Sequence, residues 1–290
     1  MSQTGGEYLR VLAAVSLDSS NEEEILLSLP HLVRGGQSGA LLRLYHVLTP
    51  EHLRLSPMEG GSFLHELARA REAAEQKLSR YCALLRERLP QEISVDYWVE
   101  SQEVASAGEE IALYLQKELF SLLVVAFKQR KRWERFFGTT ALWDVLDSAP
   151  TPILLLPAPL SIPPKRVLWV SQMQVEEFPL LKSLIPIIRF LKATLYCAKI
   201  NTPYSFYTHR SFQRHILAMC DYIIEQVAPD FVPEECILYA DKDMAEGVLH
   251  ATQDFLMDVV ALSSEGDNVD WKLLDKLLAQ QIPILLLRQQ

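Results

Sequence analysis

The sequence predicts an α/β protein made of two similar units, each with a five-stranded, mainly parallel sheet that carries helices on both faces. Short continuous apolar runs alternate with amphipathic helical patterns along the chain, as in sheets buried on both sides. The runs recur in the same order in both halves, and a proline-rich segment separates the halves. These observations together predict a duplicated strand–helix fold.

The duplication is visible in matching strings. Because the matches come in the same order in both halves, chance is a poor explanation for them. The matching pairs are RVLAAVS at 10–16 with RVLWVSQ at 166–172, LLVVAF at 122–127 with VVALSS at 259–264, and PILLL at both Pro152–Leu156 and Pro283–Leu287.

Ten apolar runs are the expected strands. Their length and continuous apolar character are typical of parallel strands covered on both faces. The first half contributes Val11–Val15, Leu41–Val47, Val95–Val99, Leu122–Ala126 and Ile153–Leu156. The second half contributes Val167–Val170, Thr194–Ile200, Ile237–Ala240, Val259–Leu262 and Ile284–Leu287.

Helical stripes lie between these runs. A long helix is expected after the second strand, with its apolar stripe at Leu64, Leu67, Leu78, Cys82, Leu85 and Leu89. Its counterpart carries Phe212, Ile216, Met219, Ile223 and Val227. Shorter stripes precede the fourth strand of each half, at Ile111, Leu115 and Leu119 and at Val248 and Phe255.

The boundary between the units is expected in the segment 157–164, which holds four prolines in eight residues. Proline cannot donate a backbone hydrogen bond and stiffens the chain, so the units should pack at a fixed geometry. The predicted division is a first domain at 1–158, a linker at 159–164 and a second domain at 165–290.

Composition excludes several classes of protein. The formal net charge of −9 argues against nucleic-acid binding, which needs a basic surface. The apolar stretch 180–198 is interrupted by Lys182, Arg189 and Lys192, so no membrane span is expected. Residues 1–7 lack the features of a signal peptide, and the four cysteines form no C-x-x-C pair. A reducing compartment, the cytoplasm, is therefore expected.

No catalytic or metal-binding constellation stands out. The seven histidines show no ligand spacing, and no nucleophile lies beside an obvious base, so neither an enzyme nor a metal site is expected. His46 is interpreted as a satisfied strand-end residue, and His209 and His215 as solvent-facing. The run Glu22–Glu24 is interpreted as the acidic first turn of a helix.

Several strings resemble the universal stress protein family, here in tandem form. VLAAVSLDSS at 11–20 resembles that family's opening strand and loop, LYHV at 44–47 its second strand, and SAPTPILLLP at 148–157 its closing strand. Residues 107–126 are similar to its preceding helix and fourth strand. The resemblance implies Rossmann-like units of the adenine nucleotide alpha hydrolase-like kind. It also implies a cytoplasmic stress-response protein with a binding or regulatory role.

Nucleotide-binding members of that family carry a loop of the form G-x-x-G, nine residues, then G-S/T. Gly138–Thr139 stands where the closing G-S/T should be, but Val125 and Lys128 occupy the positions of the earlier glycines. Ser16 replaces the family's acidic residue at the end of strand one. In the second half the corresponding segment is shorter and acidic, SSEGDNVD at 263–270, so no nucleotide is expected there.

The first half therefore holds the candidate ligand site, for ATP, ADP or another anion. Five of the eight residues at 128–135 are basic, and they could replace the lost glycine amides around a phosphate. The same run could instead be a solvated face, or a docking patch anchored by Trp133, and Gly138–Thr139 could be only a helix cap. The candidate binding residues are Ser16, Val47, Lys128, Arg130, Gly138, Thr139 and Thr140.

An alternative function is a protein-interaction module without nucleotide, docking to a transporter, a kinase or another stress-response partner. The two closing strands, at 153–156 and 284–287, should pair within one chain as the strands of a dimer would, and two chains could associate further.

Overall fold

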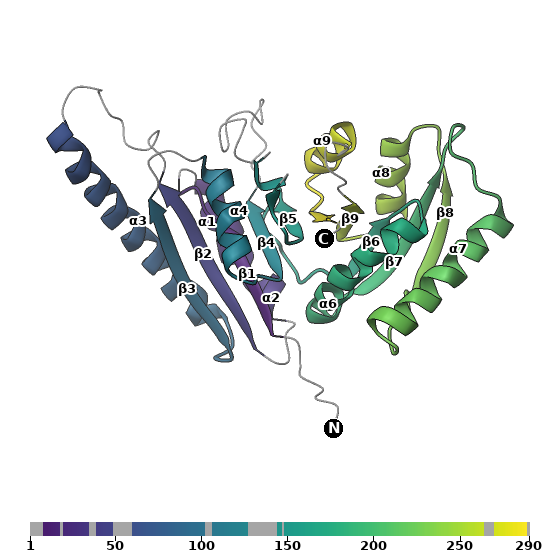
Figure 1. Cartoon of the computed structure of the whole chain (residues 1–290), viewed down its shortest axis with the longest axis horizontal. Coiled ribbons are helices and arrows are strands. Elements are labelled where there is room, and N and C mark those ends of the chain that lie inside the picture. Colours follow the sequence, from purple (N-terminus) through teal and green to yellow (C-terminus); the bar gives the residue numbers. More distant parts are fainter. Residues whose placement is uncertain are drawn as a thin grey trace.

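The computed structural model describes residues 8–17, 20–34, 39–48, 60–101, 106–126, 144–146, 148–263 and 270–288. Its strands form one ten-stranded sheet in the order β3-β2-β1-β4-β5-β10-β9-β6-β7-β8 (Figure 1). The bounds are β1 Leu9–Ala14, β2 Ala40–Leu48, β3 Ile93–Ser101, β4 Leu122–Ala126, β5 Ile153–Leu156, β6 Arg166–Val170, β7 Thr194–Asn201, β8 Glu235–Ala240, β9 Val259–Ser263 and β10 Ile284–Leu287. Each of the ten predicted strands is present.

Strands β1–β5 form the first unit and strands β6–β10 the second. In the first unit β1 lies between β2 and β4, β2 pairs with β3, and β4 pairs with β5, all in parallel. In the second unit β6 lies between β7 and β9, β7 pairs with β8, and β9 pairs with β10, again in parallel. This order is that of a doubly wound sheet, which confirms the predicted fold class.

The two units join through their closing strands. β5 and β10 pair antiparallel, with Leu155 opposite Ile284 and Leu154 opposite Leu285. This confirms that the closing strands pair within one chain. The segment that follows β5 is hydrogen-bonded to the first unit, because the Leu160 backbone N–H donates to the buried Ser28 hydroxyl at 2.9 Å. The domain limits 158, 159–164 and 165 stay a prediction.

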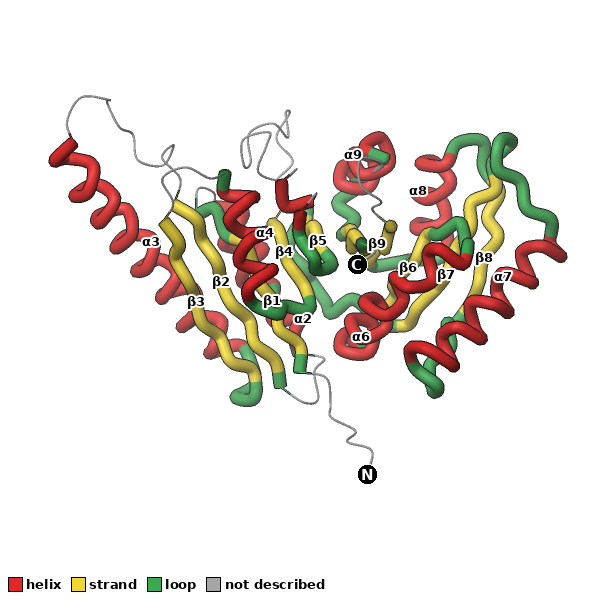
Figure 2. Tube along the Cα trace, viewed as in Figure 1, coloured by secondary structure: helices red, strands yellow, loops and turns green. Residues whose placement is uncertain are grey.

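Helices cover both faces of the sheet, and a hydrophobic core lies on each face across both units (Figure 2). One face carries α1 Ser20–Ser28, α2 Pro30–Val33, α3 Gly60–Arg88, α6 Leu181–Leu191 and α7 His209–Tyr222, with the short helices η3 Val175–Leu180 and η4 Ile223–Val227. The other face carries α4 Ala107–Lys117, α8 Met244–Asp254 and α9 Trp271–Ala279. Of the helices described, none is both long enough and apolar enough to pass through a membrane.

Candidate functional site

The candidate site of the first unit lies at the carboxyl ends of β1, β2 and β4. Ala14 pairs with Tyr45 on one side and with Val125 on the other, so the three strands end at the same edge of the sheet. Their chain connections run to opposite sides of β1, which makes this edge the switch point where doubly wound sheets bind ligands. Ser16 and Val47 both lie here. The remaining candidates, Lys128, Arg130, Gly138, Thr139 and Thr140, lie outside the described residues.

Ser16 is held by a buried carboxylate. Its backbone N–H donates to Glu22 Oε1 at 2.5 Å, and its hydroxyl donates to Glu22 Oε2 at 3.0 Å. Glu22 is 2% exposed, and burial raises its pKa above the ordinary value, although the bonds from Ser16 oppose that shift. Lys77 fixes the same loop by donating to the Leu17 carbonyl at 2.5 Å.

Sequence reasoning placed Glu22 in the acidic first turn of a helix, which α1 confirms, but missed its bond to Ser16. In the second unit the Ser171 hydroxyl donates to Glu177 Oε2 at 2.7 Å, again across six residues of sequence. Ser171 occupies the register position of Val15, one residue before Ser16, so the two serine–glutamate pairs are similar but shifted by one residue.

His46 lies near the end of β2 with its ring hydrogen-bonded, as the sequence interpretation of a satisfied strand-end residue expects. The ring is buried, and Nδ1 lies 2.7 Å from the Val15 carbonyl oxygen, to which it donates. His215, in contrast, does not simply face solvent: it is half-buried, with Nδ1 at 2.8 Å from the Met173 carbonyl and its ring edge-on to Tyr207.

The second unit has a lysine where the first has His46. Tyr45 and Ala198 occupy equivalent register positions, so Lys199 corresponds to His46. Lys199 is fully buried, and burial lowers its pKa, although nearby Glu177 opposes this. Its ammonium group donates to the Ser205 hydroxyl at 3.2 Å and lies 4.8 Å from the centre of the Tyr207 ring.

The switch point of the second unit is small and acidic. A cavity of about 130 Å³ lies here, and Glu177 and Asp270 contribute its carboxylates, beside the hydroxyls of Ser171 and Ser263. Asp270 also caps α9 by accepting from the Leu273 N–H at 3.1 Å. Ligand pockets are usually larger, roughly 300 Å³ or more. Size and charge both favour the expectation that no nucleotide binds this edge.

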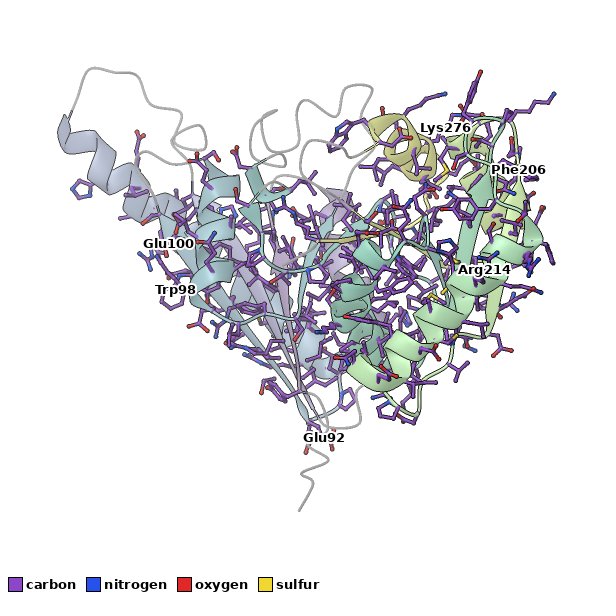
Figure 3. The ribbon with its side chains drawn as sticks, turned by 45° about the vertical axis from the view of Figure 1, so that its right-hand side comes forward. Glu92, Trp98, Glu100, Phe206, Arg214 and Lys276 are labelled. Atoms are coloured by element: carbon purple, nitrogen blue, oxygen red, sulfur yellow. The ribbon has the colours of Figure 1, made fainter. Side chains whose placement is uncertain are left out.

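The loop after β7 carries aromatic side chains and is held by internal hydrogen bonds. The Asn201 side-chain amide donates to the Tyr207 carbonyl and accepts from the Tyr207 N–H, each at 2.9 Å. Thr202 and Ser205 exchange backbone hydrogen bonds. Two aromatic side chains of this loop point into solvent: Tyr204 is 97% exposed and Phe206 is 75% exposed. Figure 3 shows Phe206 at the outer rim of the second unit.

A larger cavity, about 620 Å³, lies where the first unit meets α6. It opens at the amino ends of β1, β4 and β5, the edge opposite the switch point. Lys182 and Arg288 supply positive charge, and Arg288 also donates to the Ala149 carbonyl at 3.3 Å. Its lining is Tyr8, Leu9, Phe120, Ser121, Thr151, Pro152, Pro179, Lys182, Ser183, Pro186, Ile187, Phe190 and Arg288.

Within the described parts of the chain, no group of three or more histidine, cysteine, aspartate or glutamate side chains is arranged to hold a metal ion.

Solved structures with the same fold cover almost the whole chain. A universal stress protein from Archaeoglobus fulgidus superposes with a TM-score of 0.70 at 12% identity, covering 97% of this chain and 98% of that one. A functionally unknown protein from Pseudomonas aeruginosa gives 0.57 at 15% identity, with 99% and 95% covered. The cytoplasmic domain of a prokaryotic cation chloride cotransporter gives 0.51 at 10% identity, with 97% and 95% covered.

These likenesses, at such low identity, concern the fold alone. No curated protein matches the sequence. The sequence profile of the Universal stress protein family matches residues 7–157, more than half of the chain. The chain therefore belongs to the universal stress protein family.

Proposed function

We propose that this stress-response protein works in the cytoplasm as a binding protein, and that its first unit takes an adenine nucleotide or a related anion. The observation that carries the proposal is the switch point between β1 and β4, where Ser16 and Val47 lie on one edge. The chain leaves β4 at Ala126 on this edge and continues into the basic run 128–135. The guanidinium and ammonium groups of that run would suit a phosphate.

The two switch points differ in charge at one carboxylate. Each holds a buried glutamate bonded to a serine, Glu22 in the first unit and Glu177 in the second. The second adds Asp270 to its lining, a further carboxylate that would repel a phosphate. After β4 the sequence of the first unit continues with Lys128, Arg130 and Gly138–Thr140, which lie outside the described residues and are expected to supply positive charge and backbone amides to an anion. One ligand per chain is therefore expected.

The test begins with gentle purification, denaturation and mass analysis of the small molecules released, followed by thermal shifts with millimolar ATP and ADP. Nucleotide should co-purify or raise the melting temperature, and Gly138→Asp should abolish the effect by placing a carboxylate beside the phosphate. Asp270→Asn is the matched control, because asparagine also caps a helix; it should leave binding unchanged.

Two results would overturn this proposal. One is neither co-purified nucleotide nor any thermal shift. The other is binding that survives Gly138→Asp but is lost in Lys182→Glu, since that result would place the ligand in the cavity between the first unit and α6.

The loop of residues 202–208 favours a second candidate function, protein docking. Exposed aromatic side chains on a preformed frame lose little entropy on binding and often anchor interfaces. The residues from 199 to 220 include the exposed Arg210 and Arg214 but no aspartate or glutamate, in a chain whose net charge is −9. A partner with an acidic surface would fit this loop.

Quantitative affinity purification from cells would test docking. The double variant Tyr204→Ser, Phe206→Ser should lose a partner that the wild type retains, and the loss should deepen at higher salt. Leu119→Ser is the matched control, since Leu119 is 81% exposed on the other unit. Equal recovery with all three proteins would exclude the loop as a docking site.

A further inference from the structure

Two cysteines are side by side on the outer strands of the second unit. Cys197 on β7 is the register partner of Cys236 on β8, and β8 is the edge strand of the sheet. In-register residues of adjacent strands project to the same face. Both belong to the hydrophobic cluster on the face that α7 covers, where Cys220 also packs.

The pKa values of the two thiols move in opposite directions. Interaction with the Cys236 thiol, together with complete burial, raises the pKa of Cys197 well above its ordinary value. Interaction with Cys197 lowers the pKa of Cys236 below its ordinary value, although burial opposes the shift. Cys236 is only half-buried. The pair therefore combines a half-buried cysteine whose pKa is lowered with a buried cysteine whose pKa is raised.

The pair has no counterpart in the first unit. There the equivalent register positions are Leu44 on β2 and Tyr97 on β3. The first unit's own cysteine, Cys82 on α3, is buried, and burial raises its pKa to about 11. The proximity of Cys197 and Cys236 is thus a property of the second unit, separate from the candidate anion site.

We propose that Cys236 and Cys197 form an oxidisable pair, which a hydroperoxide converts to a disulfide that ties β8 to β7. In the first step the Cys236 thiolate attacks the peroxide O–O bond, giving a sulfenic acid, and the leaving oxygen departs as water or alcohol after taking up a proton. In the second step the Cys197 sulfur attacks the sulfenic sulfur, its thiol proton leaves with the hydroxyl as water, and the S–S bond forms. Two thiols are oxidised and one peroxide is reduced.

Backbone geometry permits this bond. Adjacent strands lie about 4.8 Å apart, and disulfides span Cα separations of roughly 4.4–6.8 Å. Register partners on β7 and β8 therefore lie within the Cα range of a disulfide, and closing the bond draws their Cβ atoms to within roughly 3.5–4.5 Å of each other. Cys220 offers no such register position, because it lies on α7.

Relative oxidation rates follow from access and thiol acidity together. Cys82 is fully buried and burial raises its pKa to about 11, whereas Cys236 is half-buried and its pKa is lowered. Cys236 should therefore be oxidised faster than Cys82.

The full-length protein is treated with hydrogen peroxide, remaining thiols are alkylated, and non-reduced peptides are analysed by mass spectrometry. A peptide joining Cys197 to Cys236 is expected in the wild type and in Cys220→Ser, and should be absent from Cys236→Ser and Cys236→Ala. Using two replacements at Cys236, a half-buried edge position, guards against loss of folding in one of them.

The inference is overturned if folded wild-type protein yields no Cys197–Cys236 peptide, or if Cys236 instead links to Cys220. Oxidation of Cys82 at the same rate as Cys236 would also overturn it, because access and thiolate character would then not distinguish the pair.

Discussion

Replacing Leu285 with alanine tests whether the two units share one cooperative structure. Leu285 on β10 is 2% exposed and lies directly opposite Leu154 on β5, which is 3% exposed. Both side chains belong to the core that spans the units on one face of the sheet. Removing a fully buried leucine side chain costs roughly 2–5 kcal/mol, and about 3 kcal/mol is expected here, since β5 and β10 can relax only together.

Thermal and urea unfolding measure the effect. Unfolding entropy near 2.1 cal/mol/K per residue gives about 0.6 kcal/mol/K for a chain of this length, so about 3 kcal/mol lowers the melting temperature by roughly 5 °C. Because the core continues across β5 and β10, one transition is expected in both the wild type and Leu285→Ala.

A double-mutant cycle sharpens this prediction. Leu154→Ala combined with Leu285→Ala should show an interaction energy of about 0.5–3 kcal/mol, because the residues touch across the junction. The matched control is Leu78→Ala on α3, also fully buried, whose effect should simply add to that of Leu285→Ala. Two resolved transitions, with only one shifted by Leu285→Ala, would refute the reasoning, as would additivity at the Leu154–Leu285 pair.

Three smaller changes probe local features. Burial raises the pKa of Glu22, so the folded state binds that proton more tightly than the unfolded state does, and the free energy of unfolding should fall as pH rises from 4.5 through the folded pKa. In urea unfolding at a series of pH values, Glu22→Gln should remove this dependence and be no less stable than the wild type at pH 7. Gly39→Ala should cost about 1–3 kcal/mol in urea unfolding, because Gly39 has φ +86° and an added Cβ would lie 2.9 Å from the Glu92 carbonyl oxygen. Ser28→Ala should cost about 1 kcal/mol and speed amide exchange at Leu160, whose N–H loses its acceptor.

The strands could be predicted from the sequence because each buried strand is itself a short run of apolar residues. Continuous apolar runs such as Leu122–Ala126 and Ile153–Leu156 match β4 and β5 to the residue. Other strands differ from the predicted runs by one or two residues at an end. β1 begins at Leu9 and ends at Ala14, before the predicted Val15, while β7 and β8 extend to the polar Asn201 and Glu235. Those side chains are placed by hydrogen bonding and register, which apolar periodicity does not report.

The candidate site was harder to predict because it depends on buried charge. Glu22 and Lys199 read as ordinary surface residues, and only the folded chain brings Glu22 to Ser16 and encloses Lys199 beneath Tyr207. Nothing local distinguishes a buried charged side chain from a solvated one, since its stabilising partners come from other elements. For the same reason, the contact of the two second-unit cysteines required the register of β7 and β8.

Joining the units through β5 and β10 also determines which edges remain for other partners. The two edge strands of the sheet are β3 and β8. Near the two ends of β3 lie Glu92, which is exposed, and Glu100 (Figure 3). Glu100 accepts a hydrogen bond from the indole N–H of the half-exposed Trp98 at 3.2 Å. If two copies of β3 met antiparallel, Glu92 of one would approach Glu100 of the other, and like charges facing each other destabilise a strand pair. Charged residues on edge strands are a common protection against such pairing. The internal junction therefore satisfies the closing strands, and the glutamates beside β3 oppose self-association through that edge of the sheet.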